Sequence, residues 1–133
     1  MIATATWKQD EVFEGRSEAG HTITFDGDSA HTHGPSPMEV VLQALCSCTS
    51  VDVVSILKKK RETVASLTVS ATAEQAPAPP RVFTKIMLTY KIGGGVSQKA
   101  AEDAVSLSKN KYCSVSKMLE KAVEIDYAIE LAD

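Results

Sequence analysis

The sequence has no excess of positive charge. Its 133 residues include 14 Lys and Arg against 17 Asp and Glu, so the formal net charge is −3. The basic residues are scattered along the chain rather than concentrated in one segment. Because proteins that hold nucleic acid through its phosphates need a concentrated positive surface, we expect no nucleic-acid partner.

The sequence also lacks an export signal and a clean membrane span. The first eight residues, Met1 to Lys8, contain no basic stretch followed by an apolar one. The most apolar stretch, Val40 to Leu57, is interrupted by polar residues that lipid would leave without partners. These are Gln43, Ser47, Thr49, Ser50, Asp52 and Ser55. We therefore expect a cytoplasmic protein with no membrane partner, in which this stretch forms a core helix.

Internal repeats, low-complexity segments and long linkers are absent as well. Apolar residues make up 44% of the chain and charged residues 23%, which is ordinary for a folded globular protein. The length is close to that of a common domain. We expect one compact domain that spans residues 1–133.

The first third of the chain shows the short runs and turn residues that are typical of strands. The expected strands are residues 2–8, 12–16 and 21–26. Ser36 and Glu39 then form the pattern of a capping box, with Pro37 at the first helical position. We expect a long helix of about 25 residues to begin there and to end near Lys60. A three-stranded meander followed by one long helix is therefore predicted.

The remaining two thirds alternate between the period of strands and that of helices. The expected elements are strands at 67–73 and 82–92, helices at 97–110 and 113–122, and a strand at 123–131. The first two of these strands are placed to form a long hairpin. Strands and helices are segregated along the chain, which predicts an α+β fold.

The long helix is apolar around its whole axis rather than along one stripe. Such a helix must be covered on most sides, and one small chain has few elements to cover it. We therefore expect two protomers to share its burial in an obligate dimer.

The chain has three cysteines, which is an odd number in an expected reducing compartment. Reactive thiols are favoured over structural bridges there. Cys46 and Cys48 lie two residues apart on the predicted helix and point about 160° away from each other, so they cannot pair with each other. Cys113 is the remaining candidate partner, and it lies in the predicted first turn of a helix, where free N–H groups favour a thiolate.

Several of these features together resemble the OsmC/Ohr family. They are the segment Gly34–Glu39, the apolar helix that carries Cys48, the segment Lys111–Ser114 and the order of the elements. The similarity covers essentially the whole chain. It implies an OsmC-like fold, in which a β-sheet wraps around a long buried central helix, and an intertwined homodimer with two active sites at the subunit interface. It also implies an organic hydroperoxide reductase of the oxidative stress response.

The resemblance assigns roles to three residues of this chain. Cys48, eleven residues after Pro37, matches the cysteine that attacks the peroxide, and Cys113 matches the one that resolves the product. Arg16 resembles the arginine that holds the thiolate and polarises the peroxide oxygen, a role that suits a planar guanidinium. In such a cycle a sulfenic acid becomes a disulfide, which an external dithiol reopens. The resemblance implies no bound cofactor and a dihydrolipoyl group as the reductant.

Two acids stand near this predicted site. The family usually has a glutamate directly after the proline that starts the helix, whereas this chain has Met38 there and Glu39 one residue later. Glu39 lies nine residues before Cys48 and thus on about the opposite side of the helix, so we expect it to cap the helix. Asp52 lies one turn after Cys48 on the same face, and its charge opposes thiolate formation unless a cation such as Arg16 lies between them.

Other interpretations of these residues remain open. Cys46 fits a small buried hydrophobe. His31 and His33 alternate in an extended loop and are candidates to bind a metal, although no third ligand is evident. As a different class of function, the chain is a candidate for a noncatalytic dimeric module that binds a small apolar ligand at its interface.

Overall fold

The computed structural model describes all residues from Met1 to Asp133 and divides the chain into two compact units. The first unit is Met1–Leu42, and the second is Gln43–Asp133. Whether the chain behaves as the single domain expected from its length stays a prediction.

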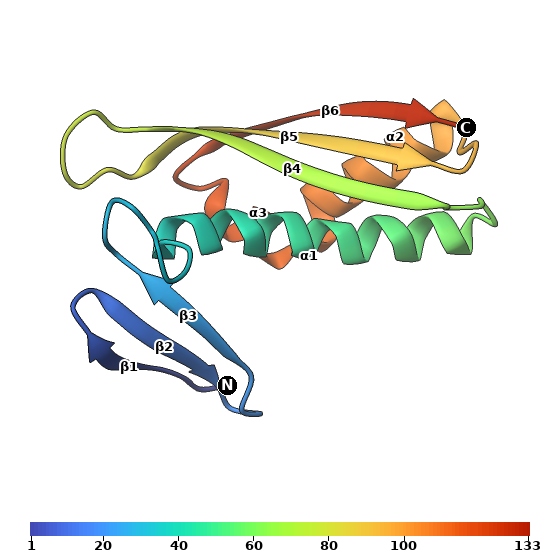
Figure 1. Ribbon diagram of the computed structural model, residues 1–133. Helices are drawn as coiled ribbons and strands as arrows, with labels where there is room; N and C mark the ends of the chain where they lie inside the picture. The colour runs from blue at the N-terminus through green and yellow to red at the C-terminus, as the bar shows by residue number, and fades with distance from the viewer. The chain divides into compact units, whose positions relative to one another are not determined.

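The first unit contains a three-stranded antiparallel meander (Figure 1). Its strands are β1 (Ala3–Gln9), β2 (Val12–Ser17) and β3 (Thr22–Asp26). The tight turn between β1 and β2 contains Asp10 at a φ of 45°, a left-handed conformation that aspartate tolerates better than most residues. All three strands confirm the elements predicted from the sequence, with ends that differ by at most one residue.

The loop after β3 returns along that strand before the long helix begins. The backbone N–H of Asp26 donates to the carbonyl of Pro35 over 3.0 Å. Gly34 is required by this close approach, because a Cβ atom there would lie 2.2 Å from the carbonyl oxygen of Thr24. The loop thereby delivers Ser36 to the start of the helix.

The capping box at the start of the helix is present. The backbone N–H of Ser36 donates to Oε1 of Glu39 over 3.0 Å, and the backbone N–H of Glu39 donates to Oγ of Ser36 over 3.2 Å. The helix, α1, spans Pro37–Lys59 and ends with two lysines in its last turn, which favours the negative end of its dipole. The expected start and end of this helix are confirmed.

Within the single chain, α1 buries one narrow stripe. Its buried residues recur every four positions and are Leu45, Thr49, Val53 and Leu57. On the other side, the Val51 side chain remains 68% exposed. By length and composition alone α1 is apolar enough to cross a membrane, but the core helix of a soluble protein passes the same test.

The second unit contains a three-stranded sheet with helices on one face (Figure 1). Its strands are β4 (Ser66–Gln75), β5 (Phe83–Gly93) and β6 (Glu124–Ala132), with β5 in the centre. The antiparallel pair of β4 and β5 confirms the predicted hairpin, and β6 adds in parallel to β5. Alternate side chains of β5 form the core of this unit. These are Ile86, Leu88, Tyr90 and Ile92, each at most 1% exposed.

Three short helical elements connect β5 to β6. They are α2 (Gln98–Leu107), the π-helical turn η1 (Ser108–Tyr112) and α3 (Ser114–Leu119). Two helices were expected here, and the π-helical turn between them was not. The segregated strands and helices confirm the α+β class.

Candidate thiol site

One side of the candidate site is a single turn of α1. Cys48 and Asp52 stand one turn apart and therefore project from the same side of the helix. Thr49, next to Cys48, belongs to the buried stripe and is fully covered. The helix thus presents a thiol and a carboxylate beside a buried hydroxyl.

The π-helical turn η1 and the start of α3 form the other side. Cys113 is fully buried, and its backbone N–H donates to the carbonyl oxygen of Ser108 over 2.8 Å. Cys113 is also the N-cap of α3, and its Sγ accepts the backbone N–H of Ser116 over 3.3 Å. The predicted helix start is therefore close to correct. The bond between Cys113 and Ser108 closes the π-helical turn η1, and Ser108 at its first position contacts Thr49 and Asp52 of α1.

A chain of buried hydroxyls joins the sheet to the helix. Tyr90 and Thr49 are joined by 2.7 Å between their hydroxyl oxygens, and so are Thr49 and Ser108. Ser108 then donates to Oδ2 of Asp52 over 2.9 Å. Since a carboxylate only accepts and each hydroxyl has one proton, the donors run in order from Tyr90 through Thr49 and Ser108 to Asp52. The network therefore ends on the one charged group among its members.

The Cys48 and Cys113 thiols are neighbours. Burial is the main cause that raises the pKa of Cys113, while the N–H of Ser116 acts in the opposite sense. The nearby Cys48 thiol and the charge of Asp52 raise the pKa of Cys113 further. The structure thus brings together two cysteines that lie 65 positions apart in the sequence, with Asp52 beside them.

Tyr90 is held in its neutral form beside these groups. Burial raises the pKa of Tyr90 to about 12, against the lowering effect of its hydrogen bond with Thr49. The charges of Cys113 and Cys46 raise it further. Cys46 is half-buried, and burial raises its pKa too. All three cysteines are free thiols.

A cavity of about 390 Å³ opens beside Asp52 in the second unit. Leu107 and Tyr112 contribute apolar surface to it, and Lys59 and Lys60 lie at the end of α1. Lys60 is paired with Asp103 at 3.2 Å. The lysine-rich end of α1 and the Asp52 carboxylate therefore line the same cavity.

Arg16 belongs to the first unit. It lies on β2, where its guanidinium is 3.5 Å from the Glu14 carboxylate and donates over 3.5 Å to the carbonyl of Gly20. Its side chain is about half exposed. The pairing of Arg16 with Cys48 stays a prediction.

Glu39 has the capping role expected of it. The backbone N–H of Ser36 is the main cause that lowers the pKa of Glu39, because it donates to the ionised carboxylate. The Oε1 atom is also 3.7 Å from Nε2 of His31. Every observed contact of Glu39 serves the loop and the helix start.

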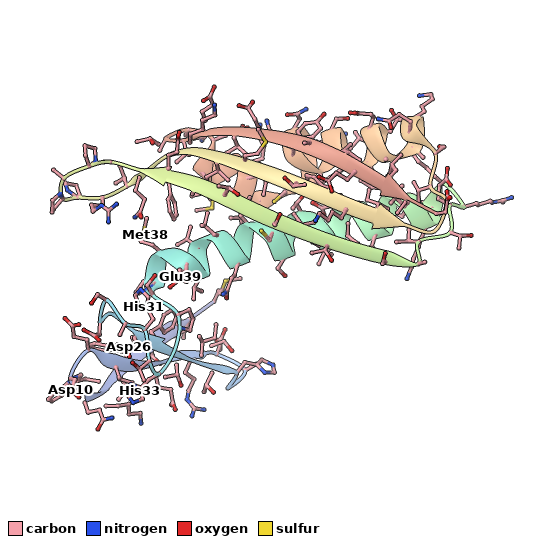
Figure 2. All side chains as sticks on the ribbon, turned by 45° about the horizontal axis from the view of Figure 1, so that its top comes forward. Asp10, Asp26, His31, His33, Met38 and Glu39 are labelled. Carbon is pink, nitrogen blue, oxygen red and sulfur yellow. The ribbon has the colours of Figure 1, made fainter.

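The two histidines of the loop are engaged with Asp26 (Figure 2). Nδ1 of His31 is 3.0 Å from the Asp26 carbonyl oxygen, and Nδ1 of His33 is 3.2 Å from the Asp26 carboxylate. The backbone N–H of Asp28 also donates to that carboxylate and is the main cause that lowers the pKa of Asp26. The structure shows no group of three or more ligands arranged for a metal, so these rings order the loop instead.

The sequence reasoning missed the hydroxyl network. Thr49, Ser108 and Tyr90 received no role, although one signal was available. Thr49 occupies the same four-residue spacing as Leu45, Val53 and Leu57, so a polar residue was placed on the buried stripe of α1 and required a partner.

Comparison with known proteins identifies the family. The model of the OsmC-like protein family matches residues 27–128, and the chain belongs to this family. Protein YhfA of Escherichia coli K12 is 44% identical over 132 residues, which cover 98% of both chains. Family membership fits a small soluble protein, whereas a cytoplasmic location stays a prediction.

Solved structures share the fold. An OsmC-like protein from Mycoplasma pneumoniae superposes with a TM-score of 0.88 at 20% identity, over 99% of this chain and 96% of that one. The organic hydroperoxide resistance protein OhrB of Bacillus subtilis gives a TM-score of 0.72 at 14% identity, over 98% of each chain. At these identities the likeness concerns the fold alone.

Proposed function

We propose that this chain reduces organic hydroperoxides with Cys48 and Cys113. The observation that supports this most directly is the pair of free, neighbouring thiols, one on α1 and one at the start of α3. The name of the structurally similar OhrB protein points to the same substrate class. Two adjacent thiols are the minimum for a cycle that ends in a disulfide.

The exposures of the two thiols assign their order. Cys113 is fully buried, whereas Cys48 is only partly covered. Cys48 is therefore the thiol that a substrate reaches first, and Cys113 is the resolving thiol. This assignment agrees with the roles that the family resemblance implies.

The proposed reaction has three steps. The Cys48 thiolate attacks the terminal peroxide oxygen and the O–O bond breaks, so that Cys48 becomes a sulfenic acid and the departing alkoxide takes a proton from water to leave as an alcohol. The Cys113 sulfur then attacks the Cys48 sulfur, which forms a disulfide and releases the hydroxyl group as water. An external dithiol reduces the disulfide by exchange, and a dihydrolipoyl group is the proposed donor, with no bound cofactor.

Arg16 and a second protomer complete the proposal. A guanidinium favours the ionised form of a nearby thiol, and Arg16 is proposed to supply this charge to Cys48. The apolar side of α1 that one chain leaves open, including Val51, is proposed to pack against the partner in a homodimer. Small hydroperoxides are the proposed substrates, and neither nucleic acid nor a membrane is a proposed partner.

The test counts thiols after addition of cumene hydroperoxide. The wild-type protein is expected to lose two free thiols per chain, whereas Cys48→Ser should lose none. Cys46→Ser is the matched control, because it removes a cysteine of the same helix and should still lose two. An unchanged thiol count in the wild-type protein would discard the proposal.

One observation favours a second candidate function, a noncatalytic module that binds a small apolar ligand. Asp52 places a negative charge beside the thiols, and the ion pairs of residues 43–133 do not include it. Such a charge opposes thiolate formation. Inert thiols together with an apolar compound extracted from the purified protein would support this alternative, and an empty protein would count against it.

A further inference from the structure

The Asp52 carboxylate is fixed by a buried donor rather than by a cation. Ser108 is fully buried and donates to Oδ2 of Asp52 over 2.9 Å, while Thr49 holds the Ser108 hydroxyl in that direction. No lysine or arginine of residues 43–133 lies within 4 Å of this carboxylate. The carboxylate is therefore positioned, and its charge is not neutralised by a salt bridge within this unit.

The same serine joins Asp52 to Cys113. The Ser108 carbonyl accepts the backbone N–H of Cys113 over 2.8 Å, and this bond spans the π-helical turn. Ser108 therefore contacts Asp52 through its side chain and Cys113 through its backbone. Asp52 also projects from the side of α1 that carries Cys48. Cys48 and Asp52 thus come from one side of α1 and Cys113 from the end of η1, and the charge of Asp52 acts on the Cys113 thiol.

Closure of the disulfide requires a proton to leave Cys113, because the thiolate is the attacking species. The titratable groups that act electrostatically with this thiol are Cys48 and Asp52 on α1 and Tyr90 on β5. Of these, Asp52 is linked to Cys113 through Ser108, whose hydroxyl donates to the carboxylate and whose carbonyl accepts the Cys113 N–H. Tyr90 donates its own proton to Thr49 and is neutral up to a pKa of about 12, so it does not serve as a base. Cys48 is the sulfur under attack. Asp52 is the group left to accept the proton.

We propose that Asp52 accepts the thiol proton of Cys113 as that sulfur attacks the oxidised Cys48, with Ser108 as the residue that positions the carboxylate. This inference rests on the proposed two-cysteine cycle and adds a residue to it. The sulfur–sulfur bond forms as the sulfur–oxygen bond of the sulfenic acid breaks. The departing hydroxide takes the proton that Asp52 received, so the products are the disulfide and water.

The experiment isolates closure from the reaction with hydroperoxide by using diamide. Diamide adds to one thiol, and the second thiol displaces the hydrazine to give the disulfide, so no peroxide is needed. The rate of closure is followed by mass spectrometry after acid quenching, in a Cys46→Ser background. Asp52→Asn is compared with Asp126→Asn, a matched control at an exposed position on β6.

Asp52→Asn is expected to slow closure about 100-fold near neutral pH, which is within the usual range for a general base. Its rate should rise about tenfold per pH unit, because closure then depends on the small thiolate fraction. The wild-type rate and the Asp126→Asn rate should rise less steeply. Lys59, Lys60 and Tyr112 line the cavity together with Asp52.

The inference is contradicted if Asp52→Asn closes the disulfide as fast as the wild-type protein or faster. If Asp52 acted only through its charge, its removal would ease ionisation of Cys113, so equal or faster closure in Asp52→Asn overturns the inference. An unchanged pH profile also overturns it. Should Asp52→Asn fail to fold, Asp52→Glu replaces it. That variant keeps the base but displaces it, so slower closure with the wild-type pH profile is expected, and an unchanged rate counts against the inference.

The two proposals fail separately. The peroxidase function is contradicted if the wild-type protein does not react with cumene hydroperoxide but forms the Cys48–Cys113 disulfide with diamide. In that case the comparison of the Asp52 variants still tests the role of Asp52. A wild-type protein that forms no such disulfide with diamide overturns the inference itself.

Discussion

At the scale of single residues, four side chains form one hydrogen-bond network between α1, β5 and η1. Tyr90, Thr49 and Ser108 are each fully buried, and Asp52 terminates the chain of donors. Buried polar groups are costly unless every member has a partner. The network thus favours one arrangement of α1 against β5 and η1, which is the arrangement that holds Cys48 beside Cys113.

Replacement of Thr49 by valine tests this network. The change keeps the shape of the side chain but leaves the Tyr90 hydroxyl without its acceptor and Ser108 without its donor. The free energy of unfolding in urea is expected to fall by about 1–3 kcal/mol. Thr68→Val on the exposed side of β4 is the control, with an expected change within about 0.5 kcal/mol. Equal effects of the two substitutions would contradict the role of the network.

The raised pKa of Cys113 predicts a loss of stability in alkali. The folded state keeps this thiol protonated above the ordinary pKa of 9.0, whereas the unfolded chain releases the proton, so unfolding is favoured as the pH rises above about 9. The slope is at most about 1.4 kcal/mol per pH unit for one group. Urea unfolding across this range should show a steeper decline for the wild-type protein than for Cys113→Ser. Parallel declines would show that the thiol is not the cause.

At the scale of elements, the sequence patterns predicted nearly every strand and helix. The alternation of β5 and the capping box at Ser36 were sufficient, because both are local signals. The parallel addition of β6 to β5 and the π-helical turn η1 were not predicted, since they depend on packing between distant segments. The same limit explains the site. The sequence was sufficient to select the cysteines as candidates. The hydroxyl network around Thr49 could not be predicted, because its members come from distant segments that contact one another only in the folded chain.

The capping box offers a test at this scale. Ser36→Ala removes the side-chain acceptor of the Glu39 backbone N–H, and the free energy of unfolding is expected to fall by about 1 kcal/mol. Thr68→Val on the exposed side of β4 is again the control, with an expected change within about 0.5 kcal/mol. A neutral Ser36→Ala would show that the helix start is fixed by other contacts.

At the scale of the whole molecule, the single chain leaves much of α1 uncovered. Only every fourth residue of α1 from Leu45 to Leu57 is buried, while other apolar side chains of the helix remain half-buried or exposed. Burial of such surface is favourable by about 25 cal/mol per Å². This is the physical basis for the proposed homodimer, in which each α1 is covered by both protomers.

Light scattering at low micromolar concentration tests the dimer. The expected mass is twice the 14.2 kDa of one chain. Val51→Glu places a charge on the uncovered side of α1 and should shift the mass toward that of the monomer, whereas Val82→Glu, at an exposed position before β5, should not. A well-folded wild-type monomer would refute the proposal.

The central claim is that Cys48 and Cys113 act as one redox pair. Its most direct test is peptide mapping of the Cys46→Ser protein after exposure to one equivalent of cumene hydroperoxide, without reduction. The account predicts a single cross-linked species that joins the peptide of Cys48 to that of Cys113 and disappears on treatment with a dithiol. Recovery of both peptides with intact thiols, or of a Cys48 that stays a sulfenic acid beside an untouched Cys113, would contradict it.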